Sequence, residues 1–175
     1  MKRIGLDLDG VLYNWHSSLY DYYRLYMNFQ GTFNDFWTSG VTSFSTETWT
    51  YLLGIDTLYS NRFPTADCIN FLEAIKNRFE IYYITSRPKS IKLTTEQYLR
   101  RFKFPFNENL IFNDNKVNVA RLLGLSYAVD DRASQIESLS KVTTAIIVAK
   151  PWNKHIWNDY PTVFSLMDIL DYLED

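Results

Sequence analysis

Residues 2–15 read KRIGLDLDGVLYNW, and the fold class is most directly predicted from these residues. A short apolar run covers residues 2–8, and the dipeptide DG then ends it. Such a run followed by an acidic residue and glycine is typical of a buried strand that enters a tight turn. We therefore predict a strand over residues 2–8 with two acidic residues, Asp7 and Asp9, at its carboxyl end.

Short apolar runs alternate with amphipathic stretches along the rest of the chain. The further expected strands are residues 80–85, 109–112, 127–130 and 145–149, and the expected helices are residues 65–79, 90–102, 117–123 and 165–173. Buried strands that alternate with helices favour a parallel sheet covered on both faces. The sequence thus predicts an α/β fold with a mainly parallel sheet flanked by helices.

The connection after the first strand is much longer than an ordinary loop between a strand and a helix, which has about 2–6 residues. Residues 13–63 also hold 15 of the 30 aromatic residues of the chain, but only four acidic and two basic residues. An insertion of this size normally has its own structure and a role. We predict one domain over residues 1–175, with a core of residues 1–13 and 64–175 and a small, mostly helical cap at about residues 14–63.

The composition excludes several classes of protein. A length of 175 residues corresponds to about one domain. The net charge of −2 offers no basic field for a nucleic-acid backbone. The sequence has no run of about 18 apolar residues that could span a membrane. With a single cysteine, Cys68, the chain cannot form an internal disulfide, so we expect a soluble intracellular protein.

Polar and ionisable residues follow every expected strand. They are Asp7 and Asp9, then Thr85, Ser86 and Arg87, then residues 113–116, then Asp130, Asp131 and Arg132, and finally Lys150 and Asn153. The carboxyl ends of parallel strands share one edge of a sheet, where ligands bind. Several carboxylates at that edge would repel one another without a cation, and oxygen ligands favour Mg²⁺ together with a substrate phosphate.

This set of residue types suits phosphoryl transfer. A carboxylate can attack phosphorus, and a second carboxyl group two residues away can protonate the leaving group and later activate water. Lys116 and the hydroxyl groups of Thr85 and Ser86 can hold the phosphate oxygens. Lys89, Lys92 and Lys150 are alternatives to Lys116 as the phosphate-binding lysine. Arg87 and Arg132 either assist phosphate binding or form surface ion pairs. His16 and His155 match no zinc motif and are interpreted as non-catalytic, and Cys68 as a core residue.

The same motifs carry a family resemblance. In order, they resemble the four motifs of the haloacid dehalogenase (HAD) superfamily of phosphohydrolases. Within it, GLDLDGVLYNW, YYITSRP, NKVNVARLLGLSYAVDDR and KPWN are similar to the 5′(3′)-deoxyribonucleotidase family and its viral and bacterial relatives. The resemblance covers residues 4–15 and 64–153, with a loose match between them. It implies a Rossmann-like HAD core with a cap inserted after the first strand.

The resemblance also implies roles for individual residues. Asp7 would be the nucleophile and Asp9 the general acid and base, while Thr85, Ser86 and Lys116 would bind phosphate. Mg²⁺ would bind the side chain of Asp7, the main-chain carbonyl of Asp9 and one of Asp130 and Asp131, of which Asp131 is preferred. Trp15, Phe36 and Trp37 would line the base site, and Trp49 is a weaker candidate.

The expected function is Mg²⁺-dependent hydrolysis of nucleoside monophosphates, with deoxyribonucleotides favoured, through an aspartyl-phosphate. Three alternatives stay open: a phosphatase for another small phosphorylated metabolite, one for the 3′ end of a nucleic acid, and a non-catalytic nucleotide-binding module. The expected partner is a small-molecule nucleotide, and a homodimer through the aromatic insert is left open. We expect the protein in the cytoplasm, or in the host cytoplasm if it is viral. The sequence leaves open the base, the sugar and the choice between 5′ and 3′ phosphate.

Overall fold

The computed structural model describes residues 1–41 and 44–174. Its sheet has six strands in the order β3-β2-β1-β4-β5-β6, and all neighbouring strands are parallel. The strands are β1 (Lys2–Leu6), β2 (Phe79–Thr85), β3 (Leu110–Phe112), β4 (Tyr127–Asp130), β5 (Thr144–Val148) and β6 (Thr162–Val163). The predicted α/β class with a parallel sheet is confirmed.

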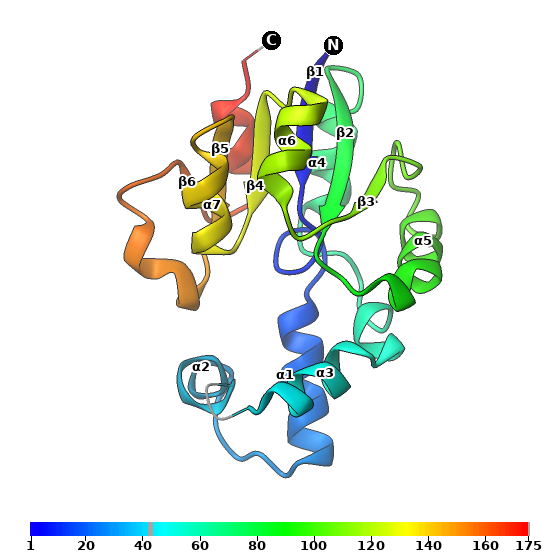
Figure 1. The fold of residues 1–175 in the computed structure, drawn as a ribbon, viewed down its shortest axis with the longest axis vertical. Coiled ribbons are helices and arrows are strands. Elements are labelled where there is room, and N and C mark those ends of the chain that lie inside the picture. Colours follow the sequence, from blue (N-terminus) through cyan, green and yellow to red (C-terminus); the bar gives the residue numbers. More distant parts are fainter. Residues whose placement is uncertain (42–43, 175) are drawn as a thin grey trace.

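Helices cover both faces of the sheet (Figure 1). Helices α4 (Cys68–Ile75) and α5 (Lys92–Arg101) and the 3₁₀ helix η6 (Met167–Tyr172) contribute to the larger core cluster on one face. Helices α6 (Lys116–Leu123) and α7 (Ala133–Leu139) contribute to the core cluster on the other face. Two short 3₁₀ helices, η4 (Lys89–Ile91) and η5 (Pro151–Ile156), follow β2 and β5.

Strand β1 lies at the centre of the sheet and packs on both faces. Ile4 and Leu6 belong to the larger core cluster, and Gly5 faces the other way. A Cβ atom on Gly5 would lie 2.7 Å from Leu125 and 2.9 Å from Ile84. Glycine at this position therefore lets the side chains of the second cluster pack directly on the central strand.

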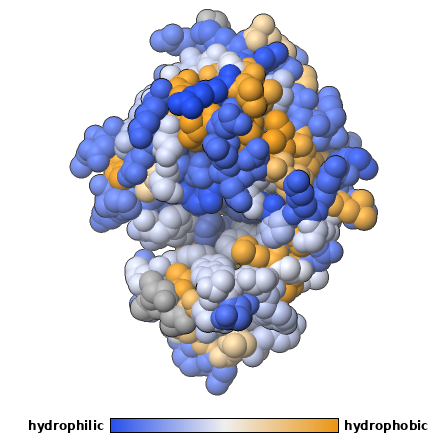
Figure 2. All heavy atoms as spheres, in the orientation of Figure 1, coloured by the Kyte–Doolittle hydropathy of each residue, from blue (hydrophilic) through white to orange (hydrophobic). Residues whose placement is uncertain are grey.

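Residues 14–63, here called the helical segment, lie beyond the carboxyl ends of the strands (Figure 1). The segment contains α1 (Trp15–Tyr26), α2 (Phe33–Asp35), a π-helical turn over Phe36–Gly40, α3 (Thr46–Leu53) and the 3₁₀ helix η3 (Asp56–Tyr59). Its two connections to the core lie side by side, because Tyr13 forms an antiparallel bridge with Pro64. Figure 2 shows the surface hollowed where the helical segment meets the core.

Most aromatic rings of the helical segment pack against one another. Phe36 is fully buried, and its ring centroid lies 5.3 Å from that of Tyr23, 5.6 Å from Phe29 and 5.7 Å from Tyr20. These large side chains allow a short segment to bury much apolar area, and Phe36 is part of the same larger core cluster as Ile4 and Leu6 of the sheet.

The chain departs from the predicted elements in three places. The α-helix predicted for residues 165–173 is wrong in type, since η6 is a 3₁₀ helix. Its one fully buried residue, Ile169, lies one three-residue turn after the buried Leu166 that precedes the helix. Helix α7 and strand β6 were not predicted, because seven residues with two buried side chains and a two-residue strand give little periodicity. Among residues 1–41 and 44–174, no helix is both long and apolar enough to cross a lipid bilayer.

Candidate active site

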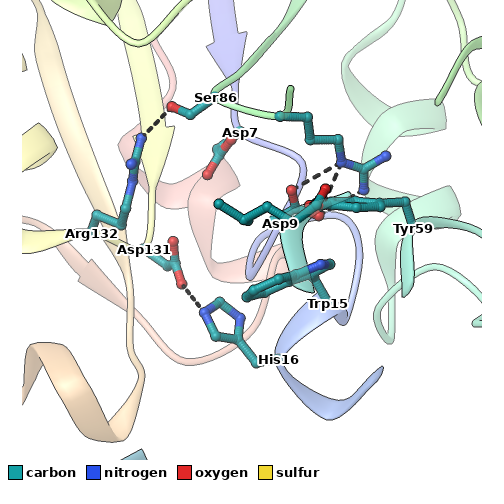
Figure 3. A pocket seen from close by; sticks show the side chains of 10 residues that line it. Asp7, Asp9, Trp15, His16, Tyr59, Ser86, Asp131 and Arg132 are labelled. Carbon is teal, nitrogen blue, oxygen red and sulfur yellow. Dashed lines mark hydrogen bonds and ion pairs between the residues drawn. The ribbon is translucent and has the colours of Figure 1, made fainter. Parts of the chain in front are cut away.

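A cavity of about 150 Å³ lies between the carboxyl ends of the strands and the helical segment. Its lining residues come from both parts of the chain: Asp7, Asp9, Trp15, His16, Leu53, Tyr59, Ser86, Arg87, Asp131 and Arg132 (Figure 3). Five of them, Asp7, Asp9, Trp15, Ser86 and Asp131, are among the site residues that the sequence predicts.

A tight turn after β1 places Asp7 and Asp9 at this cavity. The main-chain N–H of Tyr13 donates to the carbonyl of Leu8 at 2.7 Å, which closes the turn. Gly10 adopts a φ of 85°, in the left-handed region that favours glycine, and a Cβ there would lie 2.1 Å from Oδ2 of Asp131. Glycine at position 10 therefore allows Asp131 to approach the turn that carries the two predicted catalytic residues.

Three aspartates form a carboxylate cluster, consisting of Asp7, Asp130 and Asp131. One oxygen of each lies within 4.8 Å of the others, and all three residues are buried. Lys116, the first residue of α6, lies under the cluster: its Nζ is 2.8 Å from Oδ1 of Asp7 and 2.6 Å from Oδ2 of Asp130. The fold thus brings together four of the predicted site residues, from the carboxyl ends of β1 and β4 and the start of α6.

Burial dominates the electrostatics of the cluster. It raises the pKa of Asp7 to about 7, although Lys116 acts in the opposite direction. Burial, followed by the neighbouring charge of Asp130, also raises the pKa of Asp131 well above its usual value. Burial alone would lower the pKa of Lys116, but Asp130 and Asp7 outweigh it and the pKa is raised. A buried site with three carboxylates and one ammonium group favours a further cation.

Asp130 and Asp131 differ in what their oxygens contact. Oδ2 of Asp130 accepts a hydrogen bond from Lys116, and Oδ1 accepts one from the main-chain N–H of Arg132 at 2.9 Å. Oδ2 of Asp131 is buried and has no hydrogen-bond partner within residues 1–41 and 44–174. An unpartnered buried carboxylate oxygen beside Asp7 has the chemistry of a metal ligand.

The three predicted phosphate-binding residues differ in whether they reach the cavity. Ser86 lines the cavity, and its Oγ accepts a hydrogen bond from Nη2 of Arg132 at 2.7 Å. Thr85 is fully buried, and its Oγ1 accepts a hydrogen bond from the main-chain N–H of Arg87 at 3.2 Å. Lys116 lies beneath Asp7. Only Ser86 among the three lines the cavity directly.

The predicted base-binding rings separate in the structure. Trp15 lines the cavity beside Tyr59, and the two rings stack with centroids 6.0 Å apart. Trp37 lies behind Trp15, with its ring centroid 5.3 Å from that of Trp152. Phe36 lies in the core of the helical segment and is not among the residues that line the cavity. Trp49, the weaker candidate, packs against Phe44.

His16 also lines the cavity, although no motif in the sequence assigns it a role. Its Nε2 lies 3.7 Å from Oδ2 of Asp131 (Figure 3). Its ring stacks on Trp152 with centroids 4.1 Å apart. The one feature of the sequence that could have indicated a place for His16 at the cavity is its position directly after Trp15. Tyr59 was missed for a similar reason, because it is far in sequence from every motif and reaches the cavity through the fold of the helical segment.

We expect His16 to stay neutral across the physiological range. Burial, followed by the positive charges of Lys150 and Arg132, lowers its pKa to about 3. In the metal-free protein, the imidazole resonances of His16 should therefore not titrate between pH 8 and pH 5. Nuclear magnetic resonance, with His16→Gln for assignment, measures this, and a titration midpoint between pH 5 and 8 would contradict the burial argument.

Comparison with curated proteins finds two relatives named "Putative nucleotidase". One, from Oceanobacillus iheyensis, is 34% identical over 73 residues, which cover 39% of this chain and 39% of the relative's length. The other, from Bacillus cereus, is 24% identical over 188 residues and covers 98% of each chain. No protein-family model matches the chain.

Comparison with solved structures finds the same architecture over nearly the whole chain. A haloacid dehalogenase-like hydrolase from Streptococcus pneumoniae has a TM-score of 0.68 at 13% identity and covers 99% of each chain. A HAD-superfamily hydrolase of subfamily IA from Geobacter sulfurreducens has a TM-score of 0.63 at 14% identity and covers 99% of this chain and 97% of its own. With its parallel sheet and this likeness, the chain has the fold of the haloacid dehalogenase superfamily.

Proposed function

We propose that the chain is a Mg²⁺-dependent phosphatase that hydrolyses nucleoside monophosphates through a phosphorylated Asp7. The placement of Asp7 carries the proposal: its carboxylate is part of the carboxylate cluster, contacts Lys116 and lines a cavity that Asp9 also lines. Phosphoryl transfer to a carboxylate needs a nucleophile, a proton donor and nearby cations. The HAD fold and the names of the two relatives support the same assignment.

The carboxylate cluster fits Mg²⁺. Asp7 and Asp131 would hold it with their side chains and Asp9 with its main-chain carbonyl, because both oxygens of Asp130 already accept hydrogen bonds. The unpartnered Oδ2 of Asp131 is the observation that supports this choice of ligand. When bound, Mg²⁺ offsets negative charge on the phosphoryl group.

The protein side chains would carry the reaction in two halves. In the first, an oxygen of Asp7 bonds to phosphorus, the phosphorus–ester oxygen bond breaks, and the ester oxygen takes a proton from Asp9 as the nucleoside leaves. In the second, a water molecule gives a proton to Asp9 and attacks phosphorus, and the bond to Asp7 breaks to restore its carboxylate. Lys116, 2.8 Å from Asp7, would balance the negative charge in both halves.

Substrate binding would use both walls of the cavity. Ser86 and Arg132 would hold the phosphate oxygens, since both line the cavity and already contact each other. Trp15 would stack on the base, because it is the one predicted base-binding ring among the lining residues. We propose that the helical segment is a cap over the phosphate site, supported by its place beyond the carboxyl ends of the strands.

Trp15→Leu is expected to lower kcat/KM for nucleotides by about tenfold or more, since a base stacked on an aromatic ring gains about 1–3 kcal/mol. The value for a phosphate ester without a base should hardly change. Phe36→Leu is the matched control: it should lower the melting temperature, because Phe36 is fully buried, and leave both kcat/KM values close to wild type. An equal effect of Trp15→Leu on both substrates would remove Trp15 from the base site.

A release assay tests the proposed function directly. Phosphate release would be measured for ribo- and deoxyribonucleoside 5′- and 3′-monophosphates, with Mg²⁺ and with a chelator. We expect release from at least one nucleotide class, lost with chelator and restored by added Mg²⁺. The absence of metal-dependent release from every ester would contradict the proposal.

One observation favours a second candidate, a phosphatase for a smaller phosphorylated metabolite. The cavity of about 150 Å³ is smaller than the ligand pockets of about 300–1,000 Å³ that are common in proteins. A two- or three-carbon phosphate monoester in the same assay separates the two candidates. Higher kcat/KM for that ester than for any nucleotide would favour the metabolite.

A further inference from the structure

Arg87 is a buried arginine that holds the carboxylate of Asp9. Its Nε donates to Oδ2 of Asp9 at 2.9 Å, and its Nη2 donates to Oδ1 at 2.7 Å. The side chain of Arg87 is 0% exposed, whereas that of Asp9 keeps 21% of its surface accessible. The guanidinium group therefore binds Asp9 in a two-point geometry that fixes the plane of the carboxylate.

The surroundings of Arg87 make this contact rigid. Its guanidinium carbon lies 4.8 Å from the ring centroid of Tyr59 and 5.1 Å from that of Tyr13, and Nη1 donates to Oγ1 of Thr95 at 3.0 Å. Burial opposes the positive charge, but Asp9 outweighs it, and the pKa of Arg87 stays above its usual value. The group is thus held by α5, by the helical segment and by the turn after β1.

These contacts argue against the two roles that the sequence leaves open for Arg87. It is not a surface ion pair, since its side chain is fully buried. Its donors are also largely used within the protein, because each of its three nitrogens donates to Asp9 or Thr95 and at most two of its five N–H groups are left for a phosphate. Arg132 differs on both points, since its side chain is 41% exposed and contacts Ser86.

We propose that Arg87 is a positioning residue that orients the carboxyl group of Asp9 for proton transfer. This rests on the proposed function, in which Asp9 gives a proton to the ester oxygen as Asp7 bonds to phosphorus and the phosphorus–ester oxygen bond breaks. Arg87 touches neither substrate nor phosphorus in this step. Substitution of Arg87 should therefore lower the rate most for substrates whose leaving group must be protonated, because general acid catalysis contributes most for those substrates.

Two esters reveal this dependence. A nucleoside monophosphate has an alkoxide leaving group that needs a proton, whereas p-nitrophenolate leaves without one. The ratio kcat/KM reports the steps up to departure of the leaving group, so it isolates the half-reaction in which Asp9 acts as an acid. Arg87→Met keeps the stem and removes the guanidinium group. Arg87→Lys keeps the positive charge but lacks the planar fork that binds both carboxylate oxygens of Asp9 at once.

Arg87→Met should lower kcat/KM for the nucleotide about 100-fold and that for p-nitrophenyl phosphate less than about threefold. Arg87→Lys should lie between wild type and Arg87→Met on the nucleotide, and it carries the same comparison if Arg87→Met fails to fold. In an Asp9→Asn background, Arg87→Met should cause no further loss on the nucleotide, because the two residues act as a unit. The matched control is Arg3→Met, which breaks an arginine–carboxylate contact of 2.8 Å with Glu80 of β2. This contact lies at the end of β1 that is remote from Asp9. It should leave the ratio between the two substrates unchanged.

Equal losses on the two esters, additive losses with Asp9→Asn, or a gain in nucleotide activity would each overturn the positioning role. A gain would mean that the contact restrains Asp9. If the wild-type chain hydrolyses neither ester in the presence of Mg²⁺, the proposed function itself fails and the positioning role falls with it. An active wild type with unselective Arg87 variants rejects the positioning role alone.

Discussion

Asp7→Asn is expected to lower phosphatase activity by at least about 10⁴-fold, since loss of a nucleophile removes the whole covalent route. The fold should remain intact. Burial raises the pKa of Asp7 to about 7, so the ionised carboxylate weakens the folded state as the pH rises from about 4 towards 7. Asparagine carries no charge, and its side-chain oxygen can still accept a hydrogen bond from Lys116.

The free energy of unfolding checks the second half of this prediction. Asp7→Asn should be at least as stable as wild type, and its advantage should grow as the pH rises through that range. Denaturant unfolding of both proteins at pH 5 and pH 8, without metal, measures the difference. Wild-type-like turnover by Asp7→Asn would refute the assigned nucleophile, and an unfolded variant would refute the electrostatic argument.

Lys116→Met is expected to have the second largest effect, on both stability and activity. Nζ of Lys116 contacts Asp7 and Asp130, and its side chain is 3% exposed. Removing one partner from a buried ion pair leaves an uncompensated charge and costs about 3–5 kcal/mol. Turnover should fall by about 10²–10³-fold, because a preorganised cation is lost beside the transferring phosphoryl group.

Mg²⁺ should partly rescue the stability of this variant. With no ammonium group between Asp7 and Asp130, the cluster should gain more from a divalent cation than it does in wild type. Melting temperatures with and without MgCl₂ measure this difference. Lys76→Met is the matched control, since Lys76 forms an exposed ion pair with Glu73, and pairs of this kind contribute about 0–1 kcal/mol. A smaller shift with MgCl₂ in Lys116→Met than in wild type would contradict a cation site in the carboxylate cluster.

The fold was largely predictable because the strands at the centre of its sheet, β1, β4 and β5, are mostly buried. Strand β4 matches its predicted bounds of 127–130. Strands β1, β2 and β3 differ from theirs by one or two residues at one end, and β5 by one residue at each end. Near-continuous apolar runs separated by helices leave few alternatives to a parallel sheet. The exceptions, η6, α7 and β6, are short elements whose conformation depends on tertiary packing more than on local periodicity.

The position of the candidate site residues was predictable where they lie at strand ends. Asp7, Ser86 and Asp131 follow three strands, and the edge they share follows from the parallel order. The helical segment offers no comparable rule, because its fourteen aromatic residues look alike in sequence. Whether a ring is buried, as in Phe36, or faces the cavity, as in Trp15, depends on how the segment folds. The contact between Arg87 and Asp9 could not be predicted either, because 78 residues separate the two in sequence and only the folded chain brings them together.

A covalent bond between phosphorus and Asp7 is the central feature of the proposed mechanism. Acid quenching within one turnover, followed by mass spectrometry of the peptides, measures it. We predict a hydroxylamine-labile phosphoryl group on the peptide that contains Asp7, in the presence of Mg²⁺ and substrate, and none in Asp7→Asn. Phosphate release by wild type with no phosphorylated Asp7, or with the phosphoryl group on another residue, would contradict it.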